Sequence, residues 1–313
     1  MKKRLLLLII LYTCCIGANS NVLAQENENS ISASKEFEST SFTTEADAGS
    51  FNQSYKISFS WHDPVTQLPN DFYYFGQRSL NVDNVPTIAG LTALTGLLIA
   101  VDHTTSNVFI RNNKKYPMLH EMNQSVSFMG DGKFHFMMAG AFGAMGFILD
   151  DQRVLRTALQ IVEAEVVTGL TVQVLKRISG RESPQSASRP QGVFRPFPNI
   201  EEYSKNETKY YSFPSGHVST SMAVLTVIAD NFPESSWIKP VGYSAIGLVA
   251  ISLVGRGWHW FSDYPLAVAL GYTFGKVISN RNNPFDETEK SNSGLSVNPD
   301  FINGLGLAFT YKF

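Results

Sequence analysis

The chain has 313 residues, 43% of them hydrophobic, and a formal net charge of −2. A chain of this length and apolar content can form one large domain or two small ones with a sizeable core. The near-neutral charge gives no indication of a nucleic-acid partner.

The N-terminus has the three parts of a secretory signal peptide. Basic residues 2–4 precede an apolar run over residues 5–16, and residues 22–24 offer small side chains at the −3 and −1 positions of a cleavage site. The run is shorter than the ~20 residues that cross a membrane, although an uncleaved anchor is the alternative. We therefore predict a signal peptide over residues 1–24 and export to the periplasmic side of the cell envelope.

The two cysteines of the chain, Cys14 and Cys15, both lie inside this predicted signal peptide. The processed chain would then contain no cysteine. Disulfides, a thiol nucleophile and a thiolate metal site are excluded for it.

The next segments change from polar to helical in character. Residues 25–70 are rich in polar side chains and predict a flexible segment, with a weak strand pattern over residues 55–61. Residues 71–279 predict an all-α bundle of about six helices. The helices are expected over residues 85–101, 134–149, 153–177, 218–232, 241–254 and 264–278.

The sequence leaves open whether this bundle is soluble or lies in a membrane. The apolar runs are shorter than a typical span. The run over 153–177 also carries Gln160, Glu163 and Glu165, which would be costly against hydrocarbon.

Residues 280–313 are expected to form a polar linker up to about residue 300 and then a short strand. Residues 305–313 alternate apolar and small or polar side chains, as a strand with one apolar face does. The pattern is similar to the last strand of an outer-membrane barrel, but one strand cannot close a barrel. We expect an edge strand packed on the bundle, with residues 55–61 as a candidate partner.

The segment Pro214 to His217 reads Pro-Ser-Gly-His before a predicted helix. Ser215 is a good N-cap, and Gly216 lets another group approach the backbone. Free N–H groups at a helix start bind phosphate oxygens, and a histidine there can protonate a leaving oxygen. An ordinary serine cap with an incidental histidine explains the segment equally well.

His259 and Asp263 stand four residues apart, so on a helix or tight turn they face each other. The carboxylate can accept from one ring nitrogen and leave the other basic, which prepares an imidazole as a nucleophile. The common alternative is a surface ion pair, but the neighbouring tryptophans indicate partial burial.

These segments, with Lys176 at the end of a long helix, resemble the type 2 phosphatidic acid phosphatase family. That family is allied to bacterial acid phosphatases and vanadium haloperoxidases. Its motifs are Lys, six residues, Arg-Pro; then Pro-Ser-Gly-His; then Ser-Arg, five residues, His, three residues, Asp. Lys176, His217, His259 and Asp263 match these motifs in order.

Two arginines of the family pattern are missing, because Ser183 and Leu253 stand at their positions. We predict that the nearby Arg181 and Arg256 replace them and point into the phosphate pocket. For Arg256, the alternative is a cation that merely caps its helix.

The resemblance implies a phosphatase that needs no metal or cofactor. His259 would attack phosphorus, Asp263 would orient it, His217 would protonate the leaving alcohol, and water would hydrolyse the phosphohistidine. The residues expected to hold the phosphate oxygens are Lys176, Arg181, Ser215, Gly216 and Arg256.

The implied substrate is a phosphomonoester or diphosphate, of a lipid or of a small phosphoester, and the implied partner is a membrane. The sequence gives no indication of an oligomeric state. A phosphate- or lipid-binding pseudoenzyme that lost turnover with its arginines, and a vanadate-dependent haloperoxidase, are the alternatives.

Overall fold

The computed structural model describes residues 61–281 and the backbone of two strands, residues 294–300 and 306–312. The predicted signal peptide, nearly all of the predicted flexible segment and the weak strand pattern over residues 55–61 therefore lie outside the described residues.

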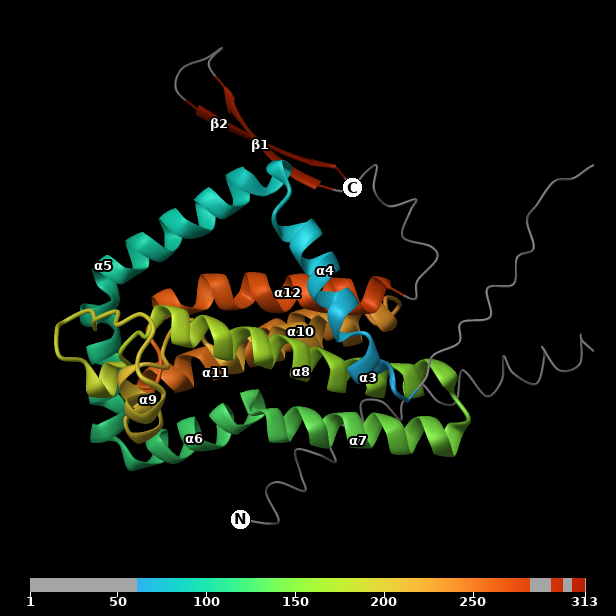
Figure 1. The fold of residues 1–313 in the computed structure, drawn as a ribbon, viewed down its shortest axis with the longest axis horizontal. Coiled ribbons are helices and arrows are strands. Elements are labelled where there is room, and N and C mark those ends of the chain that lie inside the picture. Colours follow the sequence, from blue (N-terminus) through green and yellow to red (C-terminus); the bar gives the residue numbers. More distant parts are fainter. Residues whose placement is uncertain (1–60, 282–293, 301–305, 313) are drawn as a thin grey trace, which may run out of the picture. The chain divides into compact units, whose positions relative to one another are not determined.

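The described residues are predominantly helical, which confirms the all-α prediction (Figure 1). The ranges expected to be helical overlap with α5 (Val85–Lys115), α7 (Gly132–Leu149), α8 (Gln152–Ser179), α10 (Gly216–Asn231), α11 (Ile238–Gly255) and α12 (Tyr264–Asn280). The sequence did not predict the shorter ones, α3 (Asp63–Thr66), α4 (Leu68–Ser79), α6 (Pro117–Ser127) and α9 (Ile200–Lys205). Helical structure thus begins before residue 71, because Pro64 and Pro69 each stand at a helix start, where proline is favoured.

The core is built around α10, which lies between α8 and α12 (Figure 1). Ile161 of α8, Ala223 of α10 and Phe274 of α12 are fully buried in one apolar cluster. Gly271 allows α12 to approach α10 closely, since a Cβ atom at this position would lie 2.1 Å from the carbonyl oxygen of Ser219. This packing fixes the start of α10 against the start of α12, where two of the predicted motifs lie.

Gln160, Glu163 and Glu165 of α8, which counted against a membrane, point into the protein. Gln160 donates to the carbonyl oxygen of Ile278 at 3.0 Å, and Glu165 pairs with His135 at 2.7 Å. Glu163 accepts from Arg281 at 2.7 Å, and Arg281 also donates to Asp71 of α4 at 2.5 Å. Because these groups are satisfied internally, they do not count against a lipid-facing outer surface for α8.

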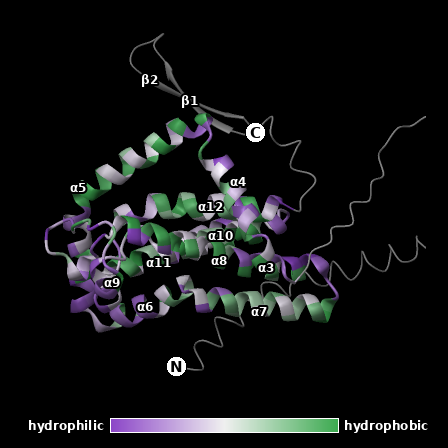
Figure 2. Cartoon of the chain, viewed as in Figure 1, coloured by the Kyte–Doolittle hydropathy of each residue, from purple (hydrophilic) through white to green (hydrophobic). Residues whose placement is uncertain are grey.

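Four helical segments are long and apolar enough to cross a membrane: Val82–Lys115, Gly132–Leu149, Gln152–Ser179 and Ile238–Gly255. Figure 2 shows hydrophobic residues along much of α5, α7 and α11. The sequence left open whether the bundle is soluble or lies in a membrane. The apolar helices support association with a membrane.

The C-terminal residues form a hairpin of β1 (Gly294–Asp300) and β2 (Gly306–Lys312). The strands are antiparallel, with Gly294 opposite Lys312 and Asp300 opposite Gly306. The expected linker thus includes a strand, which the sequence hides because Pro299 and Asp300 are rare strand residues. β1 pairs with β2, and the hydrogen bonds of this pairing stabilise a strand that the composition of β1 does not favour.

Candidate active site

His259 lies in the turn between α11 and α12, and its side chain is 1% exposed. The turn is possible because Gly257 adopts a positive φ of 74°. The Nδ1 atom of His259 lies 2.8 Å from the carbonyl oxygen of Ser212 and 3.3 Å from Oδ2 of Asp263. A carbonyl oxygen can only accept, so Nδ1 carries the proton and Nε2 keeps the lone pair. Nε2 is buried and has no hydrogen-bond partner among the described residues.

Asp263 is held by donors on both carboxylate oxygens. Oδ2 accepts from Oγ of Ser212 at 2.6 Å and from the backbone N–H of Trp260 at 2.7 Å, and Oδ1 accepts from Arg181 at 2.5 Å. Burial alone would raise the pKa of Asp263, but the charge of Arg181 and the donated hydrogen bonds hold it below its usual value. The carboxylate is therefore ionised beside the His259 ring.

The start of α10 connects the second motif to the third. Ser215 caps the helix, because its Oγ accepts from the N–H of Val218 at 3.5 Å, and its own N–H donates to the carbonyl oxygen of Asp263 at 3.2 Å. A Cβ atom on Gly216 would lie 3.7 Å from Nζ of Lys176. An ammonium group thus lies at a helix N-terminus, where backbone N–H groups lack intrahelical acceptors, and both features suit an anion.

His217 faces the same region from the first turn of α10. Its ring centroid lies 6.3 Å from that of His259 and 5.8 Å from that of Trp258. Burial, together with the neighbouring His259 and Lys176, lowers the pKa of His217 to about 3. The ring is therefore neutral at pH 7 in the ligand-free protein, and a bound phosphate dianion would favour its protonated form.

Two cations near these rings form no ion pair within residues 61–281. Lys176 lies over the Tyr211 ring, with Nζ 5.1 Å from the centroid. Arg256 lies over the Trp258 ring at 3.8 Å and donates to Oγ of Ser127. Arg256 follows directly after α11, so it stands at the helix end as well as beside the site.

Tyr211 and Trp258 are site residues that the sequence reasoning missed. The Tyr211 ring centroid lies 6.3 Å from that of His259. Burial raises the pKa of Tyr211 to about 12, although the charge of Arg256 opposes the rise. Trp258 directly precedes His259, and Tyr211 stands three positions before Pro214 of the second motif, which was the available signal.

Arg181 has different partners from those expected. Its side chain is fully buried, and Nη1 donates to Asp263 at 2.5 Å and to Oγ of Ser262 at 2.6 Å. Nη2 donates to Asp102 of α5 at 2.9 Å and to the carbonyl oxygen of Gln191 at 3.2 Å. The turn at Gly180, with a φ of 52°, ends α8 and directs the next residue inward. The terminal nitrogens of this guanidinium are thus committed to protein acceptors.

The positions of the two missing arginines are closed to solvent. Leu253 packs in an apolar cluster with Val218, Val249 and Ala267. Ser183 is also fully buried, and its N–H donates to the carbonyl oxygen of Thr208. The side chains of Ser183 and Leu253 are therefore both buried inside the protein.

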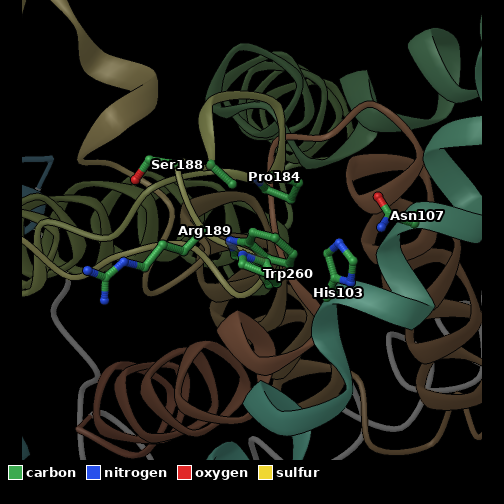
Figure 3. A pocket seen from close by; sticks show the side chains of 8 residues that line it. His103, Asn107, Pro184, Ser188, Arg189 and Trp260 are labelled. Carbon is green, nitrogen blue, oxygen red and sulfur yellow. The ribbon is translucent and has the colours of Figure 1, made fainter.

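A separate cavity of about 300 Å³ lies between α5 and the loop after α8 (Figure 3). It is lined by His103, Asn107, Pro184, Ala187, Ser188, Arg189, Pro190 and Trp260. Neither catalytic candidate histidine lines it. In the part of the chain that the structure describes, no group of three or more His, Cys, Asp or Glu side chains could hold a metal ion.

Comparison with known proteins agrees with the motif resemblance. Residues 157–285 match the family model of the PAP2 superfamily, and this range includes Lys176, His217, His259 and Asp263. No curated protein matches the chain.

Two solved structures are similar at low sequence identity. The first is a transmembrane PAP2-type phosphatidylglycerolphosphate phosphatase from Bacillus subtilis, 18% identical, with a TM-score of 0.41, covering 74% of this chain and 98% of that one. The second is LpxE from Aquifex aeolicus, 17% identical, with a TM-score of 0.40, covering 57% of this chain and 94% of that one.

Proposed function

We propose that this chain, whose residues 157–285 belong to the PAP2 superfamily, is a metal-independent phosphatase that hydrolyses a phosphomonoester or diphosphate group of a lipid. The observation that carries the proposal is the Nε2 atom of His259. It is buried without a hydrogen-bond partner among the residues that the structure describes, and the opposite nitrogen donates to Ser212 and Asp263. A lone pair held in this way suits a nucleophile.

In the first step, Nε2 of His259 attacks phosphorus and the bond from phosphorus to the leaving oxygen breaks. His217, protonated when the phosphate is bound, gives its proton to that oxygen and becomes neutral. The His259 ring now carries phosphate and a positive charge, and ionised Asp263 stabilises that charge.

In the second step, water attacks the phosphohistidine. His217 takes a proton from the water, the bond from phosphorus to Nε2 breaks, and His259 returns to its neutral state. Inorganic phosphate then leaves, and the proton on His217 is available for the next turnover.

The phosphate oxygens would be held by fixed positive charge and backbone donors. We assign this role to Lys176, Arg256 and the N–H groups at Gly216, with Ser215 fixing the helix start. Such preorganised donors stabilise the charge that develops during phosphoryl transfer. Because the terminal nitrogens of Arg181 already bind Asp102 and Asp263, we propose that Arg181 acts on the reaction through Asp263.

A lipid substrate is supported by the four apolar helices. Two basic residues between α8 and α10 are already paired, Arg195 with Glu182 and Lys205 with Glu201. An anionic head group would therefore meet Arg189 and Lys209 rather than all the basic residues of this region.

Export is proposed from the signal-like residues 1–24, and N-terminal sequencing of protein from the cell envelope should find Gln25 first. Recovery of only unprocessed chain from the cytoplasm would refute export.

The test is a phosphate-release screen with the full chain in detergent micelles. The substrates are phosphatidic acid, phosphatidylglycerophosphate, a polyprenyl diphosphate, lipid A phosphate and a soluble monoester. We expect release from at least one lipid, an acid-labile phosphoenzyme, retention of activity in EDTA and inhibition by vanadate. If folded protein releases no phosphate, the result would favour the pseudoenzyme. The two missing arginines make this the second candidate function. Halide oxidation with added vanadate would favour the haloperoxidase.

A further inference from the structure

Three charged side chains form a buried row that ends at the nucleophile. Arg181 donates from Nη2 to Asp102 at 2.9 Å and from Nη1 to Asp263 at 2.5 Å, and all three side chains are fully buried. Ser262 closes the row. Its N–H donates to Oδ1 of Asp102 at 3.2 Å, and its hydroxyl accepts from Arg181 and donates to Asp102. Asp102 is thus connected to His259 through two residues.

Asp102 lies in a helix where an ionised side chain is unexpected. It follows the apolar part of α5, and this helix belongs to a segment that is long and apolar enough to cross a membrane. A carboxylate in such a place is costly unless it is paired, and it is a candidate for a functional role. A pure packing role, tying α5 to the turn before α12, is the explanation that a test must exclude.

The charge count of the row indicates what Asp102 does. Two carboxylates and one guanidinium leave a net charge of −1 beside a neutral His259 ring. When His259 becomes phosphorylated on Nε2 its ring is cationic, and the row and the ring together become neutral. Without Asp102, the pair of Arg181 and Asp263 would already be neutral, and the cationic ring would have no net counter-charge. Buried charges are strongly affected by such an imbalance because water does not screen them.

We infer that Asp102 is a positioning residue for the phosphatase reaction: it balances the charge of Arg181, so that Asp263 keeps its negative charge available to His259. This inference rests on the proposed function. The terminal nitrogens of Arg181 are held by Asp102 as well as by Asp263, so the arrangement also fixes the carboxylate that orients the nucleophile.

The experiment changes the charge of the row in both directions. Asp102→Asn makes the row neutral, Arg181→Gln makes it −2, and the double variant Asp102→Asn/Arg181→Gln returns it to −1. The matched control is Ser106→Ala, since Ser106 is buried one turn further along α5 and its hydroxyl has no partner among the described residues. Phosphate release by the full chain in micelles gives kcat and KM for each variant.

We expect kcat of Asp102→Asn to fall at least tenfold with little change in KM, and the double variant to regain about tenfold over Asp102→Asn, within the range of couplings in one charge network. Ser106→Ala should match the wild type. A packing role predicts instead that the double variant is worse than either single variant. Wild-type kcat in Asp102→Asn, or no gain in the double variant, overturns the inference. If Asp102→Asn does not fold, the double variant must exceed Arg181→Gln, and failure to do so overturns it equally.

A second readout does not depend on turnover, namely the titration of the His259 ring followed by NMR. The groups facing this ring are Asp263, the Ser212 carbonyl, Tyr211, Lys176, His217 and Tyr264. Removing the Asp102 charge leaves Arg181 and Lys176 less balanced, so the His259 pKa should be lower in Asp102→Asn and return in the double variant. An unchanged pKa overturns the inference. A wild-type chain without phosphatase activity would refute the proposed function alone, because the ring titration still decides the role of Asp102.

Discussion

The backbone carbonyl of Ser212 lies 2.8 Å from Nδ1 of His259, closer than the carboxylate of Asp263 at 3.3 Å. The carbonyl cannot donate, so it fixes the ring tautomer whatever the state of the carboxylate. The hydroxyl of the same Ser212 donates to Asp263 at 2.6 Å. Ser212, which stands two positions before Pro214 of the Pro-Ser-Gly-His motif, therefore orients both members of the His–Asp pair.

Substitution of the nucleophile should end catalysis. We expect His259→Ala to abolish phosphate release and the acid-labile phosphoenzyme, because no other described group supplies a lone pair at that position. His103→Ala is the control, since His103 lines the separate cavity, and it should keep wild-type turnover. Near-normal activity in His259→Ala would sink the mechanism.

Substitution of Ser212 should have a graded effect. Ser212→Ala removes the hydroxyl that donates to Asp263 but keeps the carbonyl that holds Nδ1 of His259. A hydrogen bond to a charged group contributes about 1.5–3 kcal/mol, so kcat should fall roughly 10- to 100-fold. Steady-state kinetics should find residual activity well above that of His259→Ala, whereas complete loss or no loss would contradict the assignment.

Arg256 should contribute to phosphate binding in the transition state. Arg256→Ala should lower kcat/KM about a hundredfold if the side chain supplies about 2.7 kcal/mol there. Arg177→Ala is a matched control, because Arg177 is exposed near the end of α8. Kinetics with both variants decide the point: equal activity in the two would mean that Arg256 only caps its helix.

The pH dependence should follow His217. Burial lowers the pKa of His217 to about 3 in the free protein, so this general acid gains its proton only as the pH falls. We expect kcat/KM to rise as the pH decreases from about 8 to 5, while kcat persists to higher pH because bound phosphate favours the protonated ring. The pKa of His259 is also lowered by burial, which favours the neutral ring that the attack requires.

The measurement is a set of pH–rate profiles for the wild type and His217→Asn. The variant should lose the dependence along with most of its activity. A wild-type kcat/KM that increases with pH over the same range would exclude His217 as the acid.

What could be predicted from sequence depended on short spacings. Lys176, His217 and His259 each stand in a local pattern that carries its own physical meaning. Asp102 could not be found in this way, because its partner Ser262 is 160 residues away and its own neighbours are unremarkable. The direction of Arg181 depends on the left-handed turn at Gly180. A glycine after a helix favours such a turn, but it does not tell which acceptors the next side chain will reach.

The sequence could not show whether the bundle is soluble or lies in a membrane, for a related reason. Glu163 and Glu165 counted against a membrane when only their chemical type was known. Their ion pairs with Arg281 and His135 become visible only when distant helices are brought together.

Arg281 also determines how far the chain can be shortened. The helical unit was expected to end at residue 279, yet Arg281 is the counter-ion of both Asp71 and Glu163. A truncation after Ser279 would leave two buried carboxylates without that cation, and an uncompensated buried charge costs about 3–5 kcal/mol. A truncation after residue 285, where the family match ends, would keep the ion pairs of Arg281 with Asp71 and Glu163.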